Sequence, residues 1–353
     1  MPQVNVGSGP TLMMRAFQKV RHRVHNLRHR LRAGTFRFTV SWISGPRTVS
    51  AARDELVVVC LVRNGALYVP EFMRHYRELG AKHIVFLDNG STDETADLTT
   101  GHDDVTLVRT AAPYKIYKDI MKRWLVERFG RNNWVLCVDI DEFFDYPFRK
   151  DFDLRDFLRY LNGAGFTAVV AQLLDMFPEG AITKSPVEGW RQEHRFYSLR
   201  DLEREPYASF YGHSNVAPAA RIDVMHGGIR GSAFDARVLL TKHPLLFPSA
   251  GISYLHAHHV SGARVADVSA VLLHYKFVGD FIGFVKKVAK EESYSGNSRE
   301  YKKYLLAMEC LPDLRLHSSE ALEFNSTESL MEDNFLFASH TYRLAVTERG
   351  SLA

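Results

Sequence analysis

The acidic segment Asp139-Ile140-Asp141-Glu142 contains the residues of this chain that are best suited to chemistry. It follows a short apolar run at residues 134–138, whose length favours a strand buried on both faces. On an extended backbone the side chains of Asp139 and Asp141 point to the same side. Two carboxylates held close together repel each other unless a cation or a proton lies between them. Hard oxygen ligands of this kind suit Mg²⁺ or Mn²⁺, which commonly bind substrate phosphates as well.

The chain around this segment alternates predicted strands with predicted helices. Strands are predicted at residues 56–62, 83–87, 105–108 and 134–138, helices at 69–79 and 116–129, and a capping box at Ser91 and Glu94. This order predicts an α/β fold with a doubly wound, mostly parallel sheet and flanking helices. Ligands of such sheets bind at the carboxyl ends of the strands, which here carry Arg63-Asn64, Asp88 and Asp139. This placement favours a binding site over a solvated acidic turn, the alternative interpretation of the motif.

Three motifs lie at consecutive predicted strand ends: VCLVRN at 59–64, LDNGSTD at 87–93 and VDIDEFF at 138–144. They resemble the opening motifs of family 2 glycosyltransferases, which have the GT-A fold. The similarity is closest to a bacterial branch that keeps Arg-Asn after the first strand and Asp-x-Asp-Glu-Phe after the fourth. It is strong over about residues 55–148 and continues weakly through Gly227-Gly228 and residues 272–277.

The resemblance implies an enzyme that transfers a sugar from a nucleoside diphosphate sugar to an acceptor, usually with inversion of the anomeric centre. A surface glycan or a lipid-linked glycan is the acceptor that analogy favours. The implied cofactor is Mn²⁺ or Mg²⁺, held on the donor diphosphate by Asp141 and His274, with Asp139 bound directly or through water. Glu142 is expected to orient this loop. In this role the ion neutralises charge that builds up on the leaving group.

Four residues are predicted to bind the donor: Arg63, Asn64, Asp88 and Lys276. The resemblance places Asp88 near the base and ribose, where a carboxylate accepts hydrogen bonds. Its alternative role is in the turn, because Asp-Asn-Gly is also a good turn sequence. Lys276 lies two residues after His274 and therefore faces the same side, where it can meet the diphosphate.

The general base that the transfer needs is not evident from the sequence. The Glu-Asp pair usual in the family is not recognisable after Gly227-Gly228. His258 is our first candidate, because the pKa of a histidine lies near neutrality. Asp175, at the end of the strand predicted at 167–174, is the competing carboxylate. The other histidines of the second half lack the spacing of a standard zinc site and are interpreted as structural.

Two other functions remain open at this point. One is a GT-A fold that binds a sugar nucleotide or glycan without turnover. The other is a phosphatase in which the first Asp of Asp-x-Asp is the nucleophile, although that motif normally lies on the first strand of its fold. Donor hydrolysis with Mn²⁺ distinguishes them, because a transferase releases nucleoside diphosphate, a phosphatase releases phosphate from a monoester, and a binding protein releases neither.

Residues 1–53 form a basic arm with ten Lys or Arg and no Asp or Glu, whereas the net charge of the chain is only +4. Apolar residues recur from Met13 to Leu31 at intervals of four and three, which predicts an amphipathic helix. Such a helix suits an anionic membrane surface, contacted through residues 13–32. A helix packed on the domain, a protein or nucleic-acid contact and a targeting peptide are the alternatives. The acidic body lacks a basic-aromatic motif, so nucleic acid is not an expected partner.

The sequence is therefore divided into the arm, a GT-A domain at 54–315 and a C-terminal tail at 316–353. Within the domain, residues 54–148 are the predicted donor-binding half and residues 149–315 the acceptor half. Cys60 and Cys137 fall in predicted buried strands, which indicates core thiols in a reducing compartment. No window resembles a membrane-spanning helix. The expected location is the cytoplasm, with the arm holding the protein peripherally on the inner membrane face.

Overall fold

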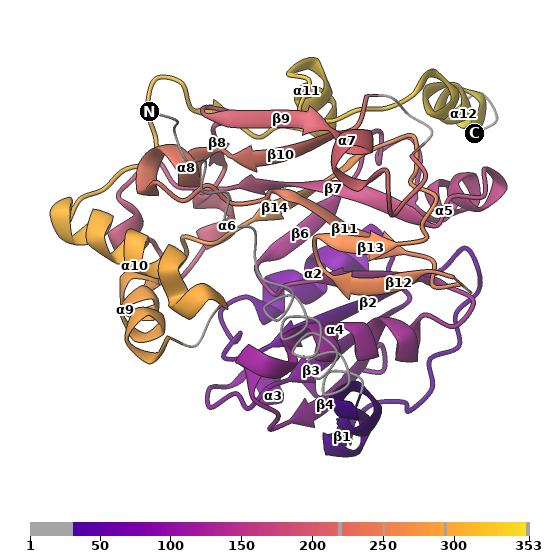
Figure 1. Ribbon diagram of the computed structural model, residues 1–353, viewed down its shortest axis with the longest axis horizontal. Coiled ribbons are helices and arrows are strands. Elements are labelled where there is room, and N and C mark those ends of the chain that lie inside the picture. The colour runs from indigo at the N-terminus through magenta and orange to yellow at the C-terminus, as the bar shows by residue number, and fades with distance from the viewer. Residues whose placement is uncertain (1–30, 218–220, 250, 293–294, 351–353) are drawn as a thin grey trace, which may run out of the picture.

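The computed structural model describes residues 31–217, 221–249, 251–292 and 295–350 of the 353-residue chain (Figure 1). A nine-stranded sheet has the order β1-β4-β3-β2-β5-β11-β7-β14-β6. Its strands are β1 (Val40–Ser44), β2 (Leu56–Val62), β3 (His83–Asp88), β4 (Val105–Thr110), β5 (Trp134–Val138), β6 (Glu142–Asp145), β7 (Ala168–Asp175), β11 (Thr241–Leu246) and β14 (Ala270–His274). The smaller strands are β8 (Phe196–Tyr197), β9 (Leu202–Pro206), β10 (Asp223–Gly227), β12 (Ser253–His256), β13 (His259–Ser261) and β15 (Leu322–Glu323).

Strands β4, β3, β2 and β5 are parallel neighbours, and β7 is parallel to β14. Strand β11 pairs antiparallel with both β5 and β7, so it joins the two parallel groups and keeps them in one direction. The edge strands β1 and β6 are antiparallel to their neighbours. The prediction of an α/β fold with a mostly parallel sheet is therefore confirmed.

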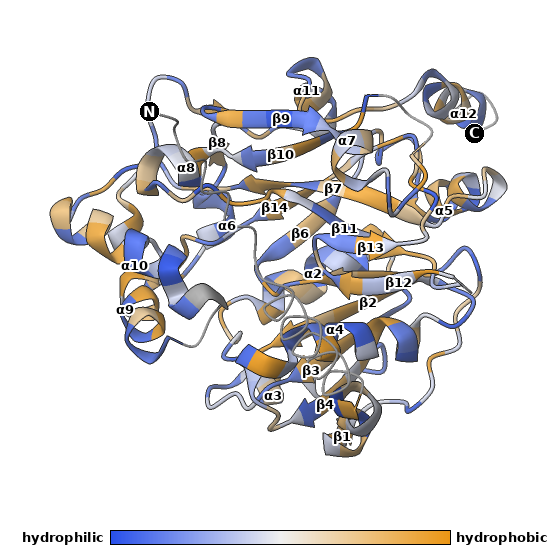
Figure 2. Cartoon of the chain, viewed as in Figure 1, coloured by the Kyte–Doolittle hydropathy of each residue, from blue (hydrophilic) through white to orange (hydrophobic). Residues whose placement is uncertain are grey.

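Helices cover both faces of the sheet. They are α2 (Val69–Leu79), α3 (Thr95–Thr99), α4 (Tyr114–Phe129), α5 (Leu154–Gly163), α6 (Trp190–Glu193), α7 (Tyr207–Tyr211), α8 (Ile229–Phe234), α9 (Phe281–Glu291), α10 (Ser295–Cys310), α11 (Thr327–Glu332) and α12 (His340–Gly350), with 3₁₀ turns η1 (Arg37–Thr39) and η2 (Ile182–Lys184). Successive residues of β2 point to opposite faces. Val58 packs in the cluster with residues of α2, α5 and α12, whereas Val59 packs in the cluster with residues of α4. In Figure 2 the residues of β2 and β3 are largely hydrophobic, whereas most residues of β9 are hydrophilic.

Local signals explain most element boundaries but not the start of α3. Helix α2 has the bounds predicted for it, with Pro in its first turn and Gly80 at φ 96° as its C-cap. The predicted capping box of Ser91 and Glu94 is wrong. The Ser91 hydroxyl instead accepts a hydrogen bond from the backbone N–H of Asn64, at 2.8 Å. Helix α3 begins at Thr95, whose N–H donates to the Asp93 carboxylate at 3.1 Å.

Both predicted domain boundaries need correction, because segments outside 54–315 belong to the same fold. Strand β1 pairs with β4, and the side chain of Phe36 is fully buried in the cluster that includes α4. At the other end, Tyr342 of α12 is fully buried and its hydroxyl donates to the carbonyl of Pro147 at 2.8 Å. The predicted amphipathic helix starts at Met13, and its residues up to 30 lie outside the described residues. Residues 31–36 are helical.

The three cysteines are free thiols, and Cys60 and Cys137 are buried as predicted. Cys310 is exposed. Within the described ranges, no helix has the length and apolar character needed to cross a membrane.

Two buried neutral histidines predict that the protein loses stability in acid. His75 and His243 are 3% and 0% exposed, and burial lowers the pKa of each to about 3. In the unfolded chain their pKa is about 6.5. Between these pKa values only the unfolded state binds the proton, so the unfolding free energy falls as the pH falls, by about 1.4 kcal/mol per pH unit for each residue.

Urea unfolding between pH 7.5 and 5 measures this dependence. His75→Gln is expected to reduce its slope by the share of one histidine, whereas His340→Gln, at an exposed position, leaves the slope unchanged. Equal slopes for His75→Gln and the wild type contradict the prediction.

Candidate metal and substrate site

A cavity of about 620 Å³ lies against the residues at and just beyond the carboxyl ends of β2, β5 and β14. Most of the residues predicted for the site line it. They are Arg63, Asn64, Asp139, Asp141, His258, His274 and Lys276. Asp88 and Asp175 are not among the lining residues. The carboxyl ends of these strands therefore bring most, but not all, of the predicted residues to one cavity.

The loop between β5 and β6 is a turn, so the prediction that Asp139 and Asp141 share one side of an extended backbone is wrong. The N–H of Glu142 donates to the carbonyl of Asp139 at 3.1 Å, and the Glu142 carboxylate accepts from the N–H of Asp139 at 3.1 Å. The carbonyl of Asp141 accepts from the N–H of Tyr275 at 2.8 Å, which fixes the loop to the end of β14. The turn gives Asp139 and Asp141 different partners.

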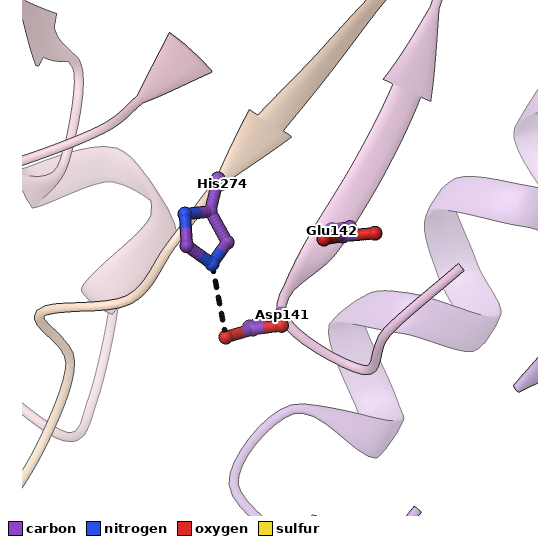
Figure 3. A group of neighbouring side chains, drawn as sticks. All are labelled: Asp141, Glu142 and His274. Carbon is purple, nitrogen blue, oxygen red and sulfur yellow. Dashed lines mark ion pairs between the residues drawn. The ribbon is translucent and has the colours of Figure 1, made fainter. Parts of the chain in front are cut away.

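Asp141 faces His274, the last residue of β14, with 3.3 Å between Oδ2 and Nε2 (Figure 3). On the far side of the ring, His274 Nδ1 lies 2.5 Å from Oδ1 of Asp175, the last residue of the neighbouring strand β7. Asp175 Oδ2 accepts from Arg230 Nε at 2.7 Å. A carboxylate that accepts from Nδ1–H leaves Nε2 directed toward the loop, where it can bind a metal.

Electrostatics support charged carboxylates in this chain of contacts. Burial would raise the pKa of Asp175, but Arg230 and His274 lower it to about 2. Burial would lower the pKa of His274, but Asp141 and Asp175 outweigh it and raise this pKa above its usual value. The two carboxylates therefore favour a positive charge on or beside the His274 ring, whether a proton or a metal ion.

A divalent ion fits the residues present. Asp141, Glu142 and His274 each offer a ligand atom, and these atoms lie within 4.8 Å of one another. Figure 3 shows the three side chains at the adjoining ends of β14 and β6. A carboxylate and imidazole set of this kind accepts Mn²⁺ or Mg²⁺, with remaining positions open to water and substrate oxygens.

Asp139, predicted as a metal ligand, instead lies between two buried lysines. Its Oδ1 accepts from Lys122 Nζ at 2.5 Å and its Oδ2 from Lys242 Nζ at 3.2 Å. Lys242 also donates to Glu142. Burial would raise the pKa of Asp139, but the two ammonium groups hold it well below the usual value. Four charged groups thus form one network beside the Asp141–His274 pair.

A second basic region of the cavity contains Arg230 and Lys276. Arg230 is only 5% exposed, and its Nη2 has no hydrogen-bond partner among the residues that the structure describes. Lys276 Nζ lies 3.3 Å from the Tyr301 hydroxyl and 4.8 and 5.5 Å from the ring centres of Tyr301 and Tyr304. No described carboxylate lies within ion-pair distance of Lys276. Both cations are therefore suited to a substrate anion.

The predicted donor-binding residues divide into two groups. Arg63 and Asn64 line the cavity, and Asn64 has a left-handed backbone at φ 54°, held by its hydrogen bonds to Ser91 and Thr92. Strain of this kind often accompanies a functional site. Asp88 is fully buried, with one oxygen bound to Arg109 at 2.7 Å and the other to the N–H of Ser91 at 2.7 Å. This geometry matches the turn role that the sequence left open.

The two candidate bases also differ in their surroundings. Both carboxylate oxygens of Asp175 are bound, one to Arg230 and the other to His274. Asp175 is therefore placed to orient the His274 ring. His258, at the β12–β13 hairpin, lines the cavity, and its Nδ1 lies 2.8 Å from the carbonyl of Thr241. Since that Nδ1 donates, Nε2 is the unprotonated nitrogen. Burial lowers the pKa of His258 to about 3, which keeps the ring neutral but makes it a weak base.

Sequence reasoning missed three cations: Lys122, Lys242 and Arg230. Lys242 lies in a short segment, Thr241 to Leu246, that the structure buries throughout, but Thr241 and His243 beside it are also polar, so its sequence signal is weak. Arg230 follows Gly227-Gly228, the point where the family resemblance continues only weakly. Lys122 has no such signal, because it lies on a helix that also carries exposed charges.

Known proteins add no further assignment. No protein-family description matches the chain, and a search of curated proteins found no significant match.

Proposed function

We propose that this protein is a metal-assisted glycosyltransferase of GT-A fold that takes a nucleoside diphosphate sugar as its donor. The observation that carries the proposal is the Asp141–His274–Asp175 arrangement at adjoining strand ends, of which Asp141 and His274 line the same cavity as Arg63 and Asn64. Three sequence motifs of the family meet at this edge of the sheet. The strand order, with one antiparallel strand joining two parallel groups, is compatible with that fold.

In this proposal Asp141 and His274 hold a divalent ion, which supplies charge neutralisation for the departing diphosphate. Asp175 keeps the His274 ring in the tautomer that directs Nε2 toward the ion. Arg230 and Lys276 contact oxygens of the donor, because both are cationic and face the cavity. Arg63 and Asn64, at the end of β2, lie at the nucleotide side.

A phosphatase that uses Asp139 as nucleophile finds less support. A nucleophilic carboxylate must offer an oxygen to phosphorus. Both oxygens of Asp139 are bound by ammonium groups at 2.5 and 3.2 Å.

The proposed function is tested by incubating the full chain with UDP-, GDP-, CDP- and dTDP-sugars, with Mn²⁺ or with EDTA. A bound donor raises the melting temperature by mass action. We expect one nucleotide class to raise it only with Mn²⁺ and to release nucleoside diphosphate slowly in the presence of water. A shift without release supports the non-catalytic alternative, and release of phosphate from a monoester supports the phosphatase.

His258→Ala is expected to lower the rate of sugar transfer by about 10²-fold, the lower end of the range for a general base. The low pKa of His258 is the reason for choosing that end, because a weak base removes a proton less readily. Donor affinity is expected to stay the same, since the base contacts the acceptor. Steady-state kinetics with a transferring acceptor, beside His256→Ala as the neighbouring control, measure the effect. An unchanged rate removes His258 from the mechanism.

The proposed acceptor is a glycan or a lipid-linked glycan, which the arm brings close through an anionic membrane. Residues 1–53 carry no acidic side chain, and Leu31 and Phe38 are 60% and 76% exposed. We expect the full chain to sediment with phosphatidylglycerol vesicles in low salt and to be released at high salt, because screening weakens exposed charges. A variant that lacks residues 1–30 is expected to bind at least about 10-fold more weakly. Equal binding to neutral and anionic vesicles contradicts this role.

A further inference from the structure

The network of Lys122, Asp139, Lys242 and Glu142 has a role that the proposed function does not use. We propose that Lys242 acts as a built-in cation that withholds Glu142 and Asp139 from the metal, so that the ion is bound weakly until the donor supplies further ligands. In this role Lys242 is a positioning residue that controls metal affinity. The inference rests on the proposed metal site at Asp141 and His274.

The contacts of the network account for every carboxylate oxygen of Asp139 and Glu142. Lys122 donates to Oδ1 of Asp139 and Lys242 donates to Oδ2. Lys242 also donates to Oε1 of Glu142, and the N–H of Asp139 donates to Oε2. Lys122, Lys242 and Glu142 are 7%, 6% and 2% exposed, so little water competes for these contacts.

Glu142 is nevertheless close enough to serve as a ligand. Its carboxylate lies within 4.8 Å of the ligand atoms of Asp141 and His274. An ion that recruits Glu142 must displace the Lys242 ammonium from Oε1. While the Lys242 ammonium remains bound to Glu142, the protein offers the ion two ligands, Asp141 and His274, and the charge of that ammonium repels the ion.

Two protein ligands leave most positions of a six-coordinate ion to water and substrate oxygens. The affinity for the ion then depends on the diphosphate, and by linkage the affinity for the diphosphate depends equally on the ion. Such a site binds ion and donor together and releases ion and nucleotide together. A tighter site with Glu142 as a third protein ligand would retain the ion and lose this coupling.

Lys242→Met tests the inference by removing the ammonium while keeping the length of the side chain. Binding of Mn²⁺ is followed by the loss of the EPR signal of the free aqueous ion, in the absence of nucleotide. We expect the variant to bind Mn²⁺ about 10–100-fold more tightly than the wild type, and UDP or GDP to enhance its Mn²⁺ affinity less. Lys287→Met, which removes an exposed charge on α9, is the matched control and is expected to bind like the wild type.

The double variant Lys242→Met with Glu142→Gln keeps the test valid if the single variant does not fold. It removes one positive and one negative charge together, and such replacements of a buried pair are often tolerated. Because Glu142 is not a ligand while Lys242 holds it, we expect this variant to bind Mn²⁺ within about 3-fold of the wild type.

The inference is overturned if folded Lys242→Met binds Mn²⁺ no more tightly than the wild type, or if the double variant loses about 10-fold or more in Mn²⁺ affinity. The second result would mean that Glu142 already ligates the ion in the wild type. Failure of the proposed function gives a different result, because the wild type would then bind no Mn²⁺ even with UDP, GDP, CDP or dTDP present.

Discussion

Asp141→Asn is expected to abolish Mn²⁺-dependent binding of the donor while leaving the protein folded. The change removes the carboxylate whose Oδ2 lies 3.3 Å from His274 Nε2, and a neutral amide is a much weaker ligand for a hard cation. We expect donor affinity with Mn²⁺ to fall by more than about 100-fold, since loss of even an outer partner of a metal ligand typically costs 10–100-fold. Isothermal titration with Mn²⁺ or EDTA measures both affinities.

Asp280→Asn is the matched control for this variant. Asp280 lines the same cavity, but its carboxylate caps α9 by accepting from the N–H of Gly283 at 2.9 Å. Asn is also a good N-cap, so this variant is expected to keep both the fold and the metal-dependent affinity. If Asp141→Asn and the wild type bind the donor equally well with and without Mn²⁺, the metal site is not at Asp141.

Asp175→Ala is expected to destabilise the protein by about 3–5 kcal/mol, the cost of breaking a buried ion pair by removing one partner. Arg230 then keeps only its longer contact with Glu300, at 3.4 Å. Asp175 and Arg230 are each 5% exposed, and the Asp175 carboxylate is bound to both Arg230 and His274. The free energy of unfolding is obtained from urea titrations at pH 7. Combining Asp175→Ala with Arg230→Met is expected to recover most of the loss, because the double variant no longer buries the Arg230 charge.

Metal affinity separates the two roles considered for Asp175. A residue that positions His274 lowers the affinity for Mn²⁺ when it is removed. Loss of a general base lowers the rate of transfer alone. An unchanged affinity for Mn²⁺ in folded Asp175→Ala, with a large loss of transfer rate, would restore Asp175 as the base.

The first four parallel strands of the sheet and helix α2 could be predicted from the sequence because their signals are local. The run from Leu56 to Val62 is apolar throughout and rich in valine, and the structure buries every residue of it. Helix α2 ends where Gly80 adopts a left-handed conformation that other residues disfavour. These features depend on residues close in the chain, so spacing alone reveals them.

The site could be predicted only in part, because its electrostatics depend on contacts between distant segments. Lys242 is 103 residues from Asp139 in sequence, and the antiparallel pairing of β11 with β5 places the two together. The turn after Val138 was also missed, since the alternation rule assumes an extended backbone that the acidic loop does not keep. The prediction that Asp141 and His274 share a site came from the resemblance to the family, whereas the partners of Asp139 carry no motif.

The arm and the tail were assigned outside the domain for a related reason. The arm has no acidic residue and the family resemblance covers neither segment, but neither observation reports packing. Phe36 and Tyr342 are nevertheless both fully buried. Only the three-dimensional contacts with α4 and with Pro147 reveal that these segments complete the fold.

Pulsed EPR of bound Mn²⁺ tests the central claim most directly. The full chain is examined with Mn²⁺ and whichever of UDP, GDP, CDP or dTDP raises its melting temperature most. The account predicts a ¹⁴N coupling from the His274 ring that disappears in His274→Ala, and a ³¹P coupling from the diphosphate that disappears when nucleotide is omitted. Mn²⁺ that is bound with nucleotide but gives no ¹⁴N coupling, or the same coupling in His274→Ala, contradicts it.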